Sequence, residues 1–336
     1  MRLTFLTYSN MIELTSIVTH DDFDGIAGAA LLSWGFDISD IRFAGPITIA
    51  KAEIPITLAD IVCDLPYPLE CGMWFDHHSG NLDEVKLRGI DPATIPGRFA
   101  EAPSCVRVIY DYFAEKDELP EDYAQLADVA DLIDSFSYPS LDDWRADTPA
   151  NRIDRAIKCS SSSRYEHAGF LRSLAFDMRD FSLEEIANQP LIIERARSYG
   201  EAEQRMLENI QKYRLLLPED TRNELYIVDT TSFSQPARID KKLIGLVDPL
   251  AKGYVEIKPV FRQGRKSHSL AVSLSLALNM QQVEHSKDMG EIVRLLNLGD
   301  GHKGAAAGVK EGNSAHQFQR ARSELPLKIL EIWKKM

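Results

Sequence analysis

Apolar and polar positions follow two different periods along the first half of the chain. Short apolar runs, typical of buried strands, alternate with stretches in which apolar side chains recur at the three- and four-residue spacing of a helix. Strands alternating with helices indicate a largely parallel sheet covered on both faces. The predicted strands are residues 16–19, 59–63 and 73–75, and the predicted helices are residues 26–36, 103–114 and 123–136.

The second half of the chain has a different pattern. A long helical stretch over residues 183–217 is followed by two alternating segments, 254–261 and 269–276, which a polar turn separates. These segments predict an antiparallel hairpin with one buried face. A helix over 289–298 and a glycine-rich loop over 299–304 come next. The predicted organisation is an α/β chain with a parallel-sheet domain (1–182), a helical linker (183–218) and a smaller α/β domain (219–336).

Composition narrows the class of protein. With 336 residues, 44% of them hydrophobic, the chain can bury a proper core, which excludes disordered chains and disulfide-stapled mini-proteins. The net charge of −13 argues against long nucleic acid held by charge alone. The longest apolar run, residues 25–36, is shorter than the ~20 residues of a spanning helix. Because the four cysteines form no CxxC pair, we expect a protein of the reducing cytoplasm.

Histidine and aspartate residues follow three of the predicted strands. In open α/β sheets, ligands bind at the carboxyl ends of the strands, so these side chains should meet at one edge. Imidazoles and carboxylates crowded together are costly unless a cation lies among them. Single segments have plainer explanations, a helix N-cap for Asp22 or Asp24 and a turn for Asp64, but the convergence favours a metal site. The residues are His20, Asp22 and Asp24, then Asp64, then Asp76, His77 and His78.

The ligand types favour particular metals. Mixed imidazole and carboxylate ligands suit Mn²⁺, Zn²⁺ or Fe²⁺ better than Mg²⁺. A later helix adds Asp131, with Asp134 one turn further as the alternative; we prefer Asp131 because it follows Val129 and Ala130. Four aspartates would balance two divalent ions. Two ions about 3.5–4 Å apart form the usual clamp for displacement at phosphorus.

These segments, in this order, resemble the four motifs of the DHH phosphoesterase superfamily. That group includes RecJ-type exonucleases, nanoRNases, cyclic-dinucleotide and pAp phosphatases and family II pyrophosphatases. The stretch from Gly299 to Ala306, GDGHKGAA, resembles the GGGH loop of the accessory domain called DHHA1. The resemblance covers almost the whole chain. It implies an N-terminal parallel-sheet DHH domain joined by a long helix to a smaller α/β DHHA1 domain.

The resemblance implies a role for each matching residue. His78 would face the scissile phosphate, and Asp76 would orient the adjacent histidines. The substrate's phosphate or terminal nucleotide would be held by Gly299, Gly301 and His302. One ion would be held by His20, Asp22 and Asp64, and the other by Asp24, Asp64, His77 and Asp131, which makes Asp64 the bridge.

Two further features belong to the second domain. Arg262 and Arg265, on the predicted hairpin turn, would either add a cationic contact to the substrate or form a solvated turn. Asp300 stands where the family's loop has a glycine, and its charge would oppose a phosphate.

The activity implied by the resemblance is metal-dependent hydrolysis of phosphodiester or phosphomonoester bonds. Two metal ions, which we expect to be Mn²⁺, would activate the attacking water. The expected substrates are small: short single-stranded oligonucleotides, dinucleotides or pAp. No signal for duplex or membrane binding is present, and a homodimer stays open. The alternatives are a phosphoanhydride hydrolase of the exopolyphosphatase or pyrophosphatase type, and a nucleotide-binding sensor without turnover.

Overall fold

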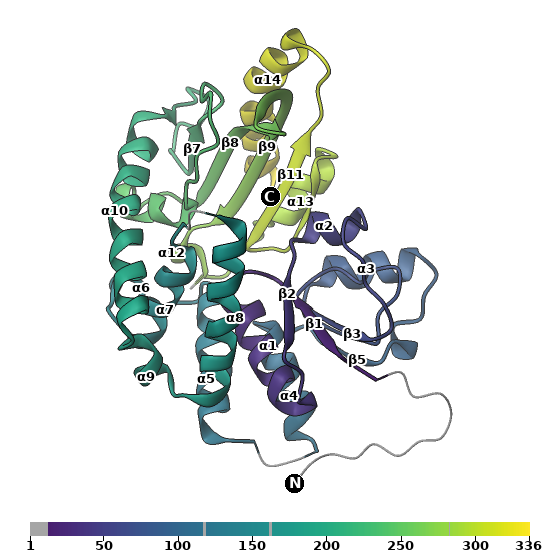
Figure 1. Ribbon diagram of the computed structural model, residues 1–336. Helices are drawn as coiled ribbons and strands as arrows, with labels where there is room; N and C mark the ends of the chain where they lie inside the picture. The colour runs from purple at the N-terminus through teal and green to yellow at the C-terminus, as the bar shows by residue number, and fades with distance from the viewer. Residues whose placement is uncertain (1–12, 117–118, 161–162, 282) are drawn as a thin grey trace. The chain divides into compact units, whose positions relative to one another are not determined.

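The computed structural model describes residues 13–116, 119–160, 163–281 and 283–336 (Figure 1). The chain divides into two compact units, Met1–Ser135 with Arg152–Ile193, and Phe136–Asn151 with Glu194–Met336. Two helices, α7 (Pro149–Lys158) and α10 (Pro190–Lys212), pass from one unit to the other. The domain boundaries at 182/183 and 218/219 stay a prediction from sequence pattern.

The first unit contains a five-stranded sheet in the order β2-β1-β3-β4-β5, with every neighbouring pair parallel. This confirms the predicted parallel sheet. Strand β1 pairs in register with strands on both sides, so Ile17 lies opposite Ile41 and Ile61. The edge strands β2 and β5 were not predicted. The strands are β1 (Ser16–Thr19), β2 (Asp40–Phe43), β3 (Asp60–Cys63), β4 (Met73–Asp76) and β5 (Gly97–Phe99).

Helices cover both faces of this sheet. Helix α1 is buried over most of its length and packs against α4, α5 and α8. A separate cluster, which includes Val18, Ile49, Val62, Trp74 and Val85, brings residues of the sheet together with residues of α2 and α3. The helices are α1 (Phe23–Phe36), α2 (Pro46–Ala50), α3 (Ser79–Leu87), α4 (Cys105–Ala114), α5 (Glu121–Asp134), α8 (Arg164–Asp180) and α9 (Leu183–Ala187), with a 3₁₀ turn at Pro92–Thr94.

The second unit contains a six-stranded sheet in the order β10-β11-β9-β8-β7-β6, antiparallel except for the pair β7–β8. The predicted hairpin is confirmed as β8 and β9. The strands are β6 (Arg214–Leu215), β7 (Leu225–Asp229), β8 (Gly253–Arg262), β9 (Arg265–Leu276), β10 (Gly299–Gly301) and β11 (Ala305–Lys310).

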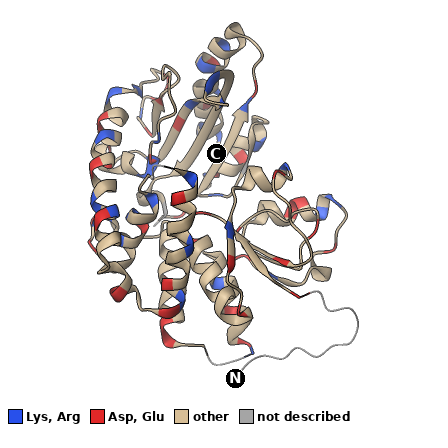
Figure 2. Ribbon diagram, in the orientation of Figure 1, with Lys and Arg blue, Asp and Glu red and all other residues tan. Residues whose placement is uncertain are grey.

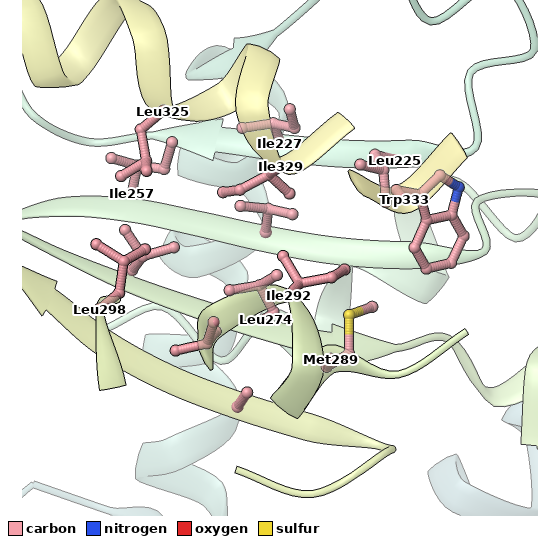
Figure 3. Close-up of a cluster of buried hydrophobic side chains, with 14 of the residues drawn as sticks. Leu225, Ile227, Ile257, Leu274, Met289, Ile292, Leu298, Leu325, Ile329 and Trp333 are labelled. Atoms are coloured by element: carbon pink, nitrogen blue, oxygen red, sulfur yellow. The ribbon is translucent and has the colours of Figure 1, made fainter. Parts of the chain in front are cut away.

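One face of this second sheet carries the unit's core. Side chains of β7, β8 and β9, among them Ile227, Ile257 and Leu274, pack against Ile292 of α13 and Ile329 of α14 (Figure 3). The helices of this unit are α6 (Leu141–Arg145), α11 (Ile244–Val247), α12 (Leu278–Gln281), α13 (Met289–Leu295) and α14 (Ala315–Lys335), with a 3₁₀ turn, η2, at Lys241–Leu243.

Two predictions about local structure were wrong. The continuous helix over 183–217 is interrupted between α9 and α10, and it ends at Lys212 before β6. Pro190 begins α10, where its missing N–H costs nothing. The glycine-rich loop contains the strand β10, because Gly299 and Gly301 pair closely with β11: a Cβ at either would lie 2.4 Å from a carbonyl oxygen of β11.

Charge is distributed along the helices. Figure 2 shows acidic and basic residues interspersed along α10, and ion pairs such as Arg320–Glu324 join neighbouring turns of α14. Among the residues that the structure describes, no helix combines the length and apolar character needed to cross a bilayer.

Candidate metal centre

Three adjacent parallel strands end at one edge of the first sheet. Strands β1, β3 and β4 lie side by side, and each is followed at once by residues that sequence reasoning singled out. Their side chains come within reach of one another: His20 Nδ1 lies 3.7 Å from Asp64 Oδ2, and His77 Nε2 lies 3.7 Å from Asp64 Oδ1. The expected convergence at this edge is therefore present.

The first motif sits where β1 passes into α1. Asp22 is the N-cap of α1: its Oδ1 accepts a hydrogen bond from Gly25 N at 3.0 Å, while its Oδ2 lies 2.7 Å from His20 Nδ1. The charge of Asp22 raises the pKa of His20 to about 10. Only glycine fits at position 25, because a Cβ there would lie 2.4 Å from the His20 carbonyl oxygen.

Asp64 occupies the middle of the cluster. Its φ of 55° is a left-handed conformation that aspartate tolerates better than most residues, and its N–H donates to Phe75 O at 3.0 Å. One carboxylate oxygen faces His20, and the other lies 3.7 Å from His77 and 3.8 Å from His78. Burial, followed by the charge of Asp22, raises the pKa of Asp64 well above its usual range.

His77 provides the sharpest evidence for a cation. Its Nδ1 lies 3.0 Å from Ala102 O, so the ring is held from one side. Its buried Nε2 has no hydrogen-bond partner among the described residues. Oxygens of Asp24, Asp64 and Asp134 surround that atom at 3.6–3.7 Å. Two ligand atoms bound at ~2.1 Å to one ion lie roughly 3.0–3.4 Å apart. The distances from Nε2 to the three oxygens would therefore have to shorten only slightly for these atoms to bind one metal ion.

Asp24 is anchored before any ion binds. Its two oxygens accept backbone N–H groups of Cys105 and Val106, at 2.7 and 2.9 Å, at the beginning of α4. Burial, with the charge of Asp134 as the next cause, raises the pKa of Asp24 to about 7. Because buried carboxylates repel one another, the cluster as it stands is short of positive charge. The residues therefore fit a metal centre.

At the fourth motif the geometry separates the two candidate aspartates. Asp131, the preferred residue, accepts hydrogen bonds from Ser104 Oγ at 2.6 Å and from Arg107 Nε at 2.8 Å. Asp134 instead lies 3.6 Å from His77 Nε2, and it joins His77 and Asp24 in a group able to hold an ion. The geometry thus favours Asp134 over Asp131, since the carboxylate of Asp131 is already paired with a guanidinium. Arg107 is the residue that would have distinguished the two aspartates, and the sequence analysis did not consider it.

Asp76 lies beneath the two histidines. It is fully buried and accepts from His77 N and His78 Nδ1, both at 2.9 Å, and from Asn81 Nδ2 at 2.6 Å. Although burial opposes it, the hydrogen bond with Asp76 raises the pKa of His78 to about 9. The orienting role expected of Asp76 stays a prediction. Asn81, on the first turn of α3, was missed because an asparagine near a helix start is common as a cap.

The residues expected to bind substrate belong to the second unit. Arg262 and Arg265 lie opposite each other at the β8–β9 turn, and Arg262 Nη2 donates to both carboxylate oxygens of Glu311 at 2.7 Å. His302 follows β10 and accepts from Gly304 N at 3.1 Å. The pairing with β11 already explains why Gly299 and Gly301 are glycines. Their contact with substrate stays a prediction.

Comparison with known proteins places the fold. No protein-family model and no curated protein sequence matches the chain. The solved structure of a pGpG-specific phosphodiesterase, PggH from Vibrio cholerae, is similar with a TM-score of 0.66 at 21% identity, over 94% of this chain and 99% of that one. RecJ in complex with Mn²⁺ from Thermus thermophilus gives 0.49 at 15% identity, over 96% of this chain and 52% of that one. An exopolyphosphatase-related protein from Bacteroides fragilis gives 0.45 at 11% identity, over 94% of each chain. The chain therefore has the fold of the PggH structure.

Proposed function

We propose that this protein is a metal-dependent phosphoesterase that hydrolyses short nucleotide substrates, such as dinucleotides, short oligonucleotides or pAp. The observation that carries the proposal is the buried Nε2 of His77, faced by three carboxylates with no hydrogen bond to any of them. The likeness to a pGpG-specific phosphodiesterase supports a dinucleotide as the first substrate to test.

The proposed ligands form two groups that share Asp64. His20 and Asp22 lie on one side of it, and Asp24, His77 and Asp134 lie on the other. Two divalent ions, Mn²⁺ in our proposal, would supply positive charge to the phosphate and lower the pKa of a water. Mixed imidazole and carboxylate ligands suit that ion.

Residues of the chain would stabilise the phosphate and protonate the leaving group. His78 is partly exposed beside the cluster, and in the metal-free protein the hydrogen bond with Asp76 raises its pKa, which favours the protonated ring. A protonated His78 can donate a hydrogen bond to the phosphate or a proton to the leaving oxygen. Asp76 positions that ring through Nδ1, and Asn81 fixes Asp76 from below.

The test is hydrolysis of the linear dinucleotides pGpG and pApA, of pAp and of pyrophosphate, with Mn²⁺, with Mg²⁺ and with a chelator. We expect release of mononucleotides with Mn²⁺ and none with the chelator. Replacing Asp64 by Asn should abolish both turnover and Mn²⁺ binding. Asp83→Asn is the matched control, because the Asp83 side chain is 71% exposed on α3. Near-normal turnover by Asp64→Asn would overturn the proposal, and turnover of pyrophosphate alone would replace it with a phosphoanhydride hydrolase.

A further inference from the structure

The second sheet has a polar face opposite its core. Side chains alternate along β8 and β9, so that Val255, Ile257, Val272 and Leu274 join the core while their neighbours point the other way. On that other face Glu256 pairs in register with Ser273, and Tyr254 pairs with Ser275. Buried polar side chains therefore lie next to one another on the central strands of the unit.

Two of these side chains are buried with hydrogen-bonding atoms unused. Glu256 is 3% exposed and Ser275 is 7% exposed. Within the part of the chain that the structure describes, neither Glu256 Oε1 nor Ser275 Oγ has a hydrogen-bond partner. An unpaired carboxylate oxygen in such a place is costly, and it calls for a donor that the described residues do not provide.

Cationic groups flank the unused oxygen. Lys258 Nζ donates to the other oxygen of Glu256 at 2.8 Å. Lys241, from the 3₁₀ turn η2, donates to Ser273 Oγ at 2.6 Å. Burial lowers the pKa of Lys241 to about 8, so at neutral pH its ammonium group keeps two further N–H groups for an acceptor.

The next strand presents short side chains beside these groups. Ala305 and Ala307 of β11 lie opposite Ser275 and Ser273, so the side chains beyond β9 on this face are methyl groups. Ala307 is exposed and Ser273 is half-buried, so this part of the face is accessible. The face thus combines an acceptor and a donor at one end with short side chains beside them.

We infer that this polar face, formed by Lys241, Glu256, Ser273 and Ser275, binds the guanine base of a nucleotide. Glu256 would accept from the adjacent N1–H and N2–H groups, and Lys241 would donate to O6. Guanine fits this arrangement because its edge presents two neighbouring donors beside an acceptor. Adenine offers one amino group beside a ring nitrogen. The inference rests on the proposed function only in taking the ligand to be a nucleotide.

The test is equilibrium binding to the full-length protein in the presence of a chelator, so that no hydrolysis is needed. We expect GMP to bind about tenfold or more tightly than AMP, and ribose 5-phosphate to bind no better than AMP. Glu256→Gln should remove the preference for GMP and leave the weaker binding of AMP unchanged. The control is Glu331→Gln, an exposed glutamate on α14, the helix that packs on the core face.

A second variant keeps the test decisive. Lys241→Met should also reduce GMP binding about tenfold, because the O6 contact is lost. Thermal unfolding would be measured for both variants, and Lys241→Met carries the test if Glu256→Gln does not fold. Equal binding of GMP and AMP, equally tight binding of ribose 5-phosphate, or an unchanged preference in the folded variants would overturn the inference. Guanine-selective binding by a protein that hydrolyses nothing would support this site and refute only the proposed enzyme.

Discussion

Two aspartates three positions apart on α5 provide a direct test of the metal centre. Asp134 faces the unpaired nitrogen of His77, whereas Asp131 is bonded to Ser104 and Arg107. Changing either aspartate to asparagine removes one negative charge and preserves the size of the side chain. We expect Asp134→Asn to lose Mn²⁺ affinity and turnover, and Asp131→Asn to retain both.

The expected sizes follow from the contacts. Residues that merely support a metal ligand cost about 10–100-fold in metal affinity when changed, so losing Asp134 itself should cost about 100-fold or more. That factor corresponds to about 3 kcal/mol. Without metal, Asp134→Asn should unfold no earlier than the wild type, because Asp134 is the charge that disfavours ionised Asp24. Asp131→Asn should cost about 1–2 kcal/mol of stability through its weakened bond to Arg107, which lowers the Tm by a few degrees.

Asp134→Asn is therefore expected to lose metal affinity but keep stability, and Asp131→Asn is expected to keep metal affinity but lose stability. Calorimetry with Mn²⁺ measures metal affinity, and thermal unfolding with a chelator measures the stability of the metal-free protein. Turnover of pGpG with saturating Mn²⁺ completes the comparison. If Asp131→Asn lost Mn²⁺ affinity while Asp134→Asn kept it, the assignment drawn from the geometry would be refuted.

Three further changes test other parts of the structure. Gly25→Ala should destabilise the protein and weaken Mn²⁺ binding, because the added Cβ would clash with a backbone carbonyl. Gly169→Ala is the control: a Cβ at that position would have no described atom within 4 Å, so the Tm should stay unchanged or rise slightly. Asn81→Ala should lower turnover about 10–100-fold by freeing Asp76, with Mn²⁺ affinity less affected; an unchanged rate would exclude this positioning role. Because the folded protein lowers the pKa of Lys241 to about 8, the unfolded state binds more protons than the folded state between about pH 8 and 10.5. The free energy of unfolding of the wild type should therefore rise with pH in that window. Denaturant unfolding of Lys241→Met should show a smaller rise.

The sheet and its ligand edge could be predicted because both depend on local pattern. A short apolar run such as Ile61–Cys63 predicts a buried strand whatever it packs against. A polar residue directly after such a run must lie at the strand's carboxyl end. Parallel pairing then brings Asp64 and Asp76 to the same edge without any knowledge of loops. The short edge strands were missed because β2 and β5 are only partly buried and lack a clear apolar run.

Side-chain choice on α5 could not be predicted in the same way. Asp131 and Asp134 lie one turn apart on the same side of one helix, and the sequence does not say which of them meets His77. The choice depends on Arg107, which arrives from α4 and pairs with Asp131. Such a contact between helices leaves no periodic trace in either segment. The polar face around Glu256 was missed for a related reason, since its acidic and basic residues come from separate segments.

The two explanations considered for Asp22 are not exclusive. The carboxylate has two oxygens, and one caps α1 through Gly25 while the other faces His20. Asp24 follows the same principle, because backbone N–H groups at the beginning of α4 hold a carboxylate that also faces His77. Helix starts thus fix the carboxylates before any ion is present, so little side-chain entropy remains to be lost when one binds. The pattern that suggested an ordinary helix cap is, in this fold, the means by which the proposed ligands are positioned.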